Sequence, residues 1–552
     1  MKKTMANIIA GIWLFVLAFA FTLVLSGCGK GSRQTLKMYA DNDKPAQMLG
    51  DYHGTTYEVF VRSFYDSNGD GIGDLQGVIK KLDYINDGDP ETDTDLGCDA
   101  IWLMPVMPSP TYHKYDVTDY CAIDPEYGTI EDYKELTEEC HKRGVKVILD
   151  TVFNHTSNMH PWFLEAVKYL TSLQKGAEPN AADCPYFDYY NFTKEKTADY
   201  YYEVPGTGWY YEGRFTKGMP DLNLYSDAVF SEIEKIIKFW QDLGVDGFRL
   251  DAVKEYVSDN TEENVKILNR INNIIFEGNP DAYAVGEAWT AYSSYSRYYA
   301  SGIPSFFNFA FGEQSGYIAK TLNGRTNSGA ESFGIMLEKV DAAIEKNAED
   351  YIDAPFYTNH DTPRSYMNYK GECLQEKVKM AQAMNLFMSG NAFLYYGEEL
   401  SMRGGAKDEE KRMPMPWDED GSEGMCLPPA NASPQELPYG TLKDQQADEL
   451  SVYNFVKQAI KIRNANPEIG RGKSTCVSEL SDENICTIKK TYREKEVYLV
   501  YNLSNETLET DLETINTESG LSLAGSLQTG NEGVTLKKTT LTLPAYSVAI
   551  LK

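Results

Sequence analysis

The sequence predicts a (β/α)8 (TIM) barrel with a domain inserted after its third strand and an antiparallel β domain at its C-terminus. Between residues 55 and 400, a short β-branched and apolar run followed by an amphipathic helical stretch recurs eight times. That alternation indicates parallel β/α units. The connection after the third run is far longer than one helix needs, and beyond about residue 465 strands alternate without helices.

These observations set the expected domain boundaries. The barrel covers residues 51–465, the inserted domain B covers 156–220, and a C-terminal β-sandwich covers 466–552. The eight expected strands are 55–64, 100–106, 146–153, 246–252, 283–289, 305–311, 355–360 and 392–397. Functional residues of such barrels lie at the C-terminal ends of the strands, so the strand tails are the place to look for a site.

The first 28 residues read as an export signal, with Lys2 and Lys3 before an apolar run over residues 8–25. The string Leu-Ser-Gly-Cys that ends at Cys28 resembles a bacterial lipobox, and a plain transmembrane anchor is the alternative. We therefore expect acylated Cys28 to hold the protein on the extracellular face of the cell membrane. Residues 29–50 are expected to form a polar tether.

Composition narrows the choice of partners. A formal net charge of −30 argues against nucleic acid, which needs basic patches, and leaves neutral polymers open as ligands. The eight cysteines after Cys28 show no zinc-ligand spacing. Cys476 and Cys486 could close a hairpin, but the sequence does not assign disulfide pairs.

Charged residues gather at the strand tails. They are Asp150, Asn154 and His155 after the third strand, Arg249 and Asp251 at the fourth, Glu287 at the fifth, and His360 and Asp361 at the seventh. Burying charges alone is costly, so this gathering indicates an ion-pair network or an active site.

Asp251 and Glu287 suit glycoside hydrolysis, which needs one ionised and one protonated carboxyl group beside the scissile bond. Arg249 lies two residues before Asp251, hence on the same face of the strand, where its cation would keep Asp251 ionised. Glu287 has an apolar setting that should raise its pKa toward that of a working acid.

Several ordered motifs resemble the α-amylase family, glycoside hydrolase family 13. They are DTVFNH (150–155), MPDLN (219–223), GFRLDAVKE (247–255), GEAW (286–289) and TNHD (358–361). The resemblance implies a nucleophile at Asp251, an acid/base at Glu287 and a transition-state stabiliser at Asp361. It also implies that His155, Arg249 and His360 line the subsite of the attacked glucose.

The resemblance extends to the segment 111–120, where Tyr115 would stack on a sugar ring beside His113 and Asp116. It implies a retaining α-amylase on starch-type α-glucans and maltooligosaccharides. The long aromatic insertion at 156–220 and His113 beside Tyr115 predict a cleft open at both ends, hence endo action. MPDLN together with RMPMPW (412–417) is similar to bacterial amylases between oligo-1,6-glucosidases and neopullulanases. An α-1,6-acting oligosaccharidase, a neopullulanase-like enzyme, a transglycosylase and a non-catalytic glucan-binding relative are the alternatives, and the oligomeric state stays open.

A calcium ion (Ca2+) is expected in the loop after the first strand. Oxygen ligands at Asp66, Asn68, Asp70 and Asp74, with the Ile72 carbonyl, follow the alternating spacing of a calcium loop. Position 12 of the loop is a glycine, which excludes an EF-hand switch. Fungal and animal α-amylases have histidine where this chain has Glu255, so the resemblance leaves their second calcium site, near Asn154, open.

Overall fold

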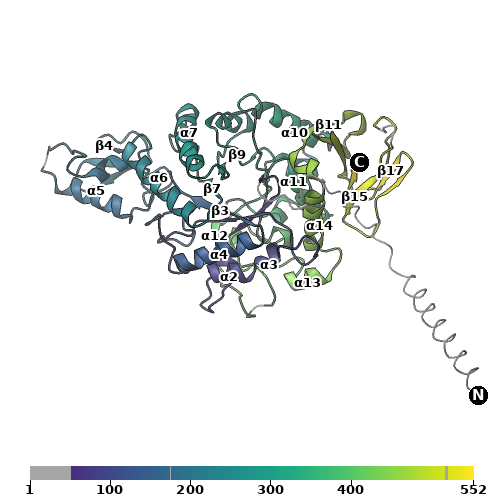
Figure 1. Ribbon diagram of the computed structural model, residues 1–552, viewed down its shortest axis with the longest axis horizontal. Helices are drawn as coiled ribbons and strands as arrows, with labels where there is room; N and C mark the ends of the chain where they lie inside the picture. The colour runs from purple at the N-terminus through teal and green to yellow at the C-terminus, as the bar shows by residue number, and fades with distance from the viewer. Residues whose placement is uncertain (1–50, 175, 420, 516–519) are drawn as a thin grey trace, which may run out of the picture. The chain divides into compact units, whose positions relative to one another are not determined.

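The computed structural model describes residues 51–174, 176–419, 421–515 and 520–552 (Figure 1). The predicted export signal, Cys28 and the tether lie outside these residues. Within the described ranges, no helix combines the length and the apolar character needed to cross a membrane.

A curled parallel sheet forms the wall of the barrel. Its strand order is β10-β1-β2-β3-β7-β8-β9. The strands are β1 (Thr55–Val59), β2 (Ala100–Leu103), β3 (Lys146–Thr151), β7 (Gly247–Leu250), β8 (Tyr283–Gly286), β9 (Ser305–Phe306) and β10 (Ala392–Tyr395). Consecutive barrel strands are neighbours and β1 also pairs with β10, so the (β/α)8 prediction is confirmed.

The seventh barrel position differs from the prediction of a strand over 355–360. The chain there makes only isolated parallel bridges, from Ala354 to Phe307 and from Phe356 to Phe393. These bridges join β9 to β10 and complete the ring. Pro355 lies between them and has no N–H to donate, which explains why no continuous ladder forms.

Helices cover the outside of the sheet, and most of them are amphipathic. The principal ones are α4 (Ile130–Lys142), α6 (Asp227–Asp242), α7 (Thr261–Gly278), α10 (Glu331–Ile344), α11 (Leu374–Leu386) and α14 (Val452–Ala465). Helix α11 differs, because it is buried on all sides over its last nine residues. Shorter ones are α2 (Leu75–Lys80), α3 (Leu82–Ile85), α8 (Tyr292–Tyr295), α9 (Tyr317–Leu322), α12 (Asp408–Lys411), α13 (Leu442–Ala447) and α15 (Pro467–Arg471). Large apolar side chains such as Trp102, Phe307 and Phe393 form one of the buried clusters.

The segment after β3 forms a small unit of its own, drawn in blue with the labels α5 and β4 in Figure 1. It contains α5 (Pro161–Ser172) and a sheet of order β4-β6-β5. The strands are β4 (Phe192–Thr193), β5 (Tyr201–Val204) and β6 (Trp209–Glu212). Phe163 of α5 packs edge-on against Tyr211 of β6, and a bridge from His155 to Asp221 brings the two ends of the segment together.

The C-terminal part is antiparallel, as predicted. A five-stranded sheet has the order β11-β12-β13-β18-β15, and a three-stranded sheet has the order β14-β17-β16. The strands are β11 (Lys473–Cys476), β12 (Ile485–Tyr492), β13 (Lys495–Asn502), β14 (Leu508–Asp511), β15 (Leu523–Gln528), β16 (Thr535–Lys537), β17 (Thr540–Leu543) and β18 (Ser547–Leu551). In the described part of the chain, the eight cysteines are free thiols, Cys476 and Cys486 included.

Candidate active site

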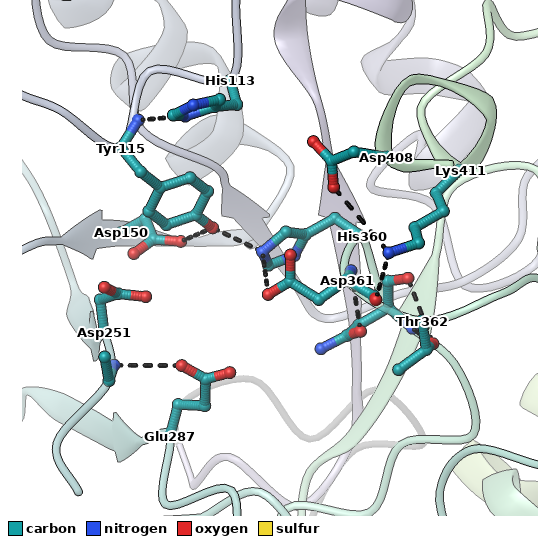
Figure 2. A network of polar contacts seen from close by, with 12 residues as sticks. His113, Tyr115, Asp150, Asp251, Glu287, His360, Asp361, Thr362, Asp408 and Lys411 are labelled. Carbon is teal, nitrogen blue, oxygen red and sulfur yellow. Dashed lines mark hydrogen bonds and ion pairs between the residues drawn. The ribbon is translucent and has the colours of Figure 1, made fainter. Parts of the chain in front are cut away.

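A cavity of about 620 Å³ is lined by residues that follow the C-terminal ends of the barrel strands. Figure 2 shows how the polar side chains around it face one another. Six of the predicted site residues line this cavity: His113, Tyr115, His155, Asp251, Glu287 and Asp361. Residues from five separate strand ends therefore meet in one place, as the barrel topology requires.

Arg249 lies beneath the cavity and is fully buried. Its Nη1 lies 2.6 Å from Asp251 Oδ1 and 2.8 Å from Asp150 Oδ1, and its Nη2 lies 3.0 Å from Glu287 Oε2. Asp251 directly follows β7 and faces the same side as Arg249, because side chains alternate along the extended chain. One guanidinium thus compensates three buried carboxyl groups, which would repel one another without it.

Glu287 follows β8 and is nearly buried. Burial raises its pKa to about 8; Arg249 opposes the rise, and the negative charges of Asp251 and Asp361 add to it. The Ala252 backbone N–H donates to Glu287 Oε2 at 3.0 Å. Ala252 has a φ of 45°, a strained value for a residue with a side chain. The N–H that follows Asp251 thus faces the Glu287 carboxyl group.

Asp361 is held by two cations. His360 Nε2 lies 3.1 Å from its Oδ2, and Arg412 Nη2 lies 3.0 Å from its Oδ1. Burial alone would raise the pKa of Asp361, but the charges of His360 and Arg412 hold it well below its usual range. Asp361 is the most exposed of the three acids, and its charge faces the cavity.

Tyr115 connects the histidine side of the site to the arginine side. Its hydroxyl lies 2.7 Å from His360 Nε2 and donates to Asp150 Oδ2 at 2.9 Å. Its ring is stacked on the His360 ring, with centroids 5.4 Å apart. Figure 2 shows this chain of contacts from His360 through Tyr115 to Asp150.

The remaining predicted residues take different positions. His155 lines the cavity, its Nε2 is buried without a hydrogen-bond partner among the described residues, and burial lowers its pKa. A neutral imidazole with a free nitrogen suits a sugar hydroxyl. His113 Nδ1 accepts from the Tyr115 N–H at 3.1 Å. Asp116 is buried and accepts from the Ser109 hydroxyl at 2.7 Å, and it is not among the residues that line the cavity.

The structure adds site residues that the sequence reasoning did not single out. Arg412 pairs with Asp361 and, through Nη1, with Asp408 Oδ2 at 2.7 Å. Arg412 and Asp408 line the cavity, together with the exposed rings of Trp289 and Phe215. The four-residue spacing of Asp408 and Arg412 after the eighth strand was the available signal.

The loop after β1, which carries the expected calcium ligands, is ordered by hydrogen bonds from its own backbone N–H groups. Asp66 accepts hydrogen bonds from the Asn68, Gly69 and Gly71 N–H groups. Asn68 and Asp70 each accept from the N–H two residues further on. Among the described residues, no group of three or more His, Cys, Asp or Glu side chains is arranged to hold a metal ion. A calcium ion here would depend on the Asn68 amide and Ile72 carbonyl oxygens as well as on carboxylates.

An ion pair connects the inserted segment to the barrel at Glu255. Arg214 Nε lies 2.8 Å from Glu255 Oε2, and Asn154 Nδ2 donates to Asp221 Oδ1 at 3.2 Å. The Arg214 N–H donates to the other Asp221 oxygen at 3.0 Å. A guanidinium therefore supplies positive charge where the two parts of the chain meet.

Comparisons with known proteins identify the family. The sequence model "Alpha amylase, catalytic domain" matches residues 58–472. "Alpha-amylase 3" of Dictyoglomus thermophilum is 36% identical over 81% of this chain and 84% of its own length. "Oligo-1,6-glucosidase" of Parageobacillus thermoglucosidasius is 28% identical over 82% of this chain and 90% of its own.

Solved structures agree with the sequence comparisons. Amy13B of Eubacterium rectale is 51% identical with a TM-score of 0.88, covering 91% of this chain and 96% of that one. An α-amylase from H. orenii is 35% identical with a TM-score of 0.78, covering 91% and 99%. The cavity, its paired acids and these matches together show that the chain is a glycosidase that belongs to the α-amylase family.

Proposed function

We propose that this protein is a retaining, endo-acting α-amylase that hydrolyses α-1,4-glucosidic bonds of starch and maltodextrins. One observation carries the proposal: two carboxyl groups on neighbouring strands share one guanidinium but have different surroundings. Asp251 lies 2.6 Å from an Arg249 nitrogen, whereas burial raises the pKa of Glu287 to about 8. Such a pair supplies one ionised and one protonated carboxyl group at neutral pH.

The two groups divide the reaction between them. An Asp251 carboxylate oxygen attacks the anomeric carbon while Glu287 gives its proton to the glycosidic oxygen, whose bond to that carbon breaks. The Glu287 carboxylate then takes a proton from water, and the water oxygen displaces Asp251 from the sugar. Two displacements restore the original α configuration.

The other cavity residues bind and orient the sugar. Asp361, ionised between His360 and Arg412, accepts hydrogen bonds from hydroxyl groups of the attacked ring. Tyr115 offers an aromatic wall to the same ring. The exposed rings of Trp289 and Phe215 offer further apolar faces for neighbouring glucose units. A cavity with several such faces can bind several glucose units of a polymer at once. This favours cleavage of internal bonds, which is endo action.

Linkage preference is the finer part of the proposal. Named relatives include an α-amylase, an oligo-1,6-glucosidase and a 4-alpha-glucanotransferase of Thermotoga neapolitana, the last 30% identical over 66% of this chain. The test is the time course of products from amylose, pullulan and isomaltose, with the anomeric configuration followed by NMR. We expect α-configured maltooligosaccharides from amylose. Exclusive cleavage of isomaltose would favour the α-1,6-acting alternative, and longer products than substrates would favour a transglycosylase.

Two further proposals concern a bound calcium ion and a lipid anchor. We propose that the loop 66–74 binds a structural calcium ion, because its sequence is rich in oxygen ligands and Asx turns order it. We also propose that Cys28 carries lipid and holds the enzyme on the outer face of the cell membrane, on the strength of the lipobox sequence alone. Labelling of the expressed protein with a radioactive fatty acid tests the second proposal, since Cys28→Ala should abolish the label.

A further inference from the structure

Glu58 is a buried acid inside the barrel that the proposed mechanism does not use. It lies on β1, in register with Trp102 of β2 and Tyr395 of β10, and is 1% exposed. Its Oε1 lies 2.5 Å from His360 Nδ1. The next residues on either side point away from the barrel interior, as Tyr57 shows by donating to Glu399. Within the described part of the chain, His360 is the side chain for which a hydrogen bond to the Glu58 carboxylate is observed, so Glu58 reaches the site through His360.

The two nitrogens of His360 both face acceptors. Nδ1 faces the Glu58 carboxylate, and Nε2 lies 3.1 Å from Asp361 Oδ2 and 2.7 Å from the Tyr115 hydroxyl. A neutral imidazole carries only one N–H and would turn a lone pair toward one of these carboxylates. Both carboxylates are satisfied only when both ring nitrogens carry a proton.

We propose that Glu58 is a positioning residue that keeps His360 doubly protonated, so that His360 holds Asp361 and Tyr115 in place for the substrate. Because the site is the one assigned above to α-glucan cleavage, this inference rests on the proposed function. Glu58 does not line the cavity, so it acts through His360 and not on the sugar.

The electrostatics of the cluster agree with the geometry. Burial alone would lower the pKa of His360, but Asp361 and Glu58 outweigh it and raise the pKa to about 10. The charged and titratable groups around the imidazole are Glu58 on β1, Tyr115 and Asp150 from the second and third strands, Asp361 beside it, and Arg412, whose Nε donates to the His360 carbonyl. Without Glu58, the imidazole keeps only one carboxylate partner. The pKa of His360 is then lower than in wild type, so the second ring proton is lost at a lower pH than in wild type.

The charge on His360 also sets the direction of the Tyr115 hydrogen bonds. When Nε2 donates, the Tyr115 hydroxyl can accept from it and donate its own proton to Asp150. When Nε2 has no proton, the single hydroxyl proton must serve both His360 and Asp150. Loss of the His360 proton therefore loosens Asp361 and Tyr115 together.

The test compares Glu58→Gln with wild type, and with Glu399→Gln as a matched control. Glu399 is also a buried glutamate, and it accepts hydrogen bonds from Tyr57 and Tyr84 away from the cavity. The substrate is an aryl α-maltotrioside with a good leaving group, because its cleavage needs no proton from Glu287. In Glu58→Gln, kcat should fall with rising pH at least about one pH unit earlier than in wild type, and mildly acidic pH should restore it. Glu399→Gln should keep the wild-type profile.

A direct measurement accompanies the kinetics. The chain has six histidines, so NMR of 15N-histidine-labelled protein, assigned with His360→Asn, reports the protonation of His360. We expect two ring N–H groups at pH 8 in wild type and loss of one at lower pH in Glu58→Gln. A neutral His360 at pH 7 in wild type would overturn the proposal, whether or not Glu58→Gln folds. An activity loss equal at every pH would overturn it too.

The two failures are distinguishable. If the proposed function is wrong, wild type itself fails to cleave the α-maltotrioside, and the NMR result still decides the role of Glu58. If only the inference is wrong, wild type cleaves the substrate and Glu58→Gln shows no shift of its pH profile.

Discussion

Substituting Glu287 by Gln removes the proposed proton donor while keeping the size of the side chain. With its pKa raised to about 8 by burial, Glu287 is mostly protonated at pH 7, whereas an ordinary glutamate would be almost fully ionised. The enzyme should therefore stay active up to about pH 8 on natural glucans and lose activity above it. The acid form is the active one, so activity falls as pH rises through that pKa.

The assay is kcat/KM on maltotriosides whose leaving groups differ in acidity. Glu287→Gln should lose about 10²–10⁴-fold on substrates with poor leaving groups, since general acid catalysis contributes that much. On maltotriosyl fluoride, whose fluoride ion leaves without needing a proton, formation of the glycosyl-enzyme should be nearly unchanged. Glu255→Gln is the matched control, because Glu255 also lines the cavity but pairs with Arg214. A loss in Glu287→Gln that is equal for all leaving groups would refute the acid role.

Three further predictions concern stability, metal and mode of attack. Arg249→Met should lower the free energy of unfolding by about 3–5 kcal/mol in urea titrations, because it leaves buried carboxylates unpaired; an unchanged midpoint would contradict this. Chelation should lower the melting temperature and calcium should restore it, with Asp70→Ala abolishing the response; unchanged melting, together with no calcium by elemental analysis, would refute the site. The viscosity of a starch solution should fall well before reducing sugar accumulates; a fall only in step with glucose release would indicate attack from chain ends.

Much of the barrel and of the site could be predicted from local sequence, because hydrophobic periodicity and strand ends carry that information. Asp251 directly follows β7 and lies two residues after Arg249, so their meeting follows from the alternation of side chains along the extended chain. The prediction of a strand over 355–360 was wrong because Pro355 interrupts the ladder there. The apolar pattern of the segment indicated a strand and did not reveal this local effect of the proline.

What the sequence reasoning missed depends on contacts across the barrel. Glu58 and His360 are 302 residues apart, and a single Glu within an apolar strand gives no sign of its partner. Arg412 follows the short helix α12 and pairs with Asp361, and in the sequence only its four-residue spacing from Asp408 marks it. Asp116 follows Tyr115 in the chain, but its side chain is buried against Ser109 and does not line the cavity. The local loop sets this direction. Such contacts join residues that are far apart in the sequence, so they can be identified only from the assembled barrel.

The proposed retaining mechanism requires that Asp251 form a covalent bond to the sugar. The direct measurement is mass spectrometry of Glu287→Gln after incubation with maltotriosyl fluoride, which lets the glycosyl-enzyme form but slows its hydrolysis. We expect one maltotriosyl group on the peptide that contains Asp251, and none when Asp251→Asn is added. A stable label on a different residue, or products of β configuration without any label, would contradict it.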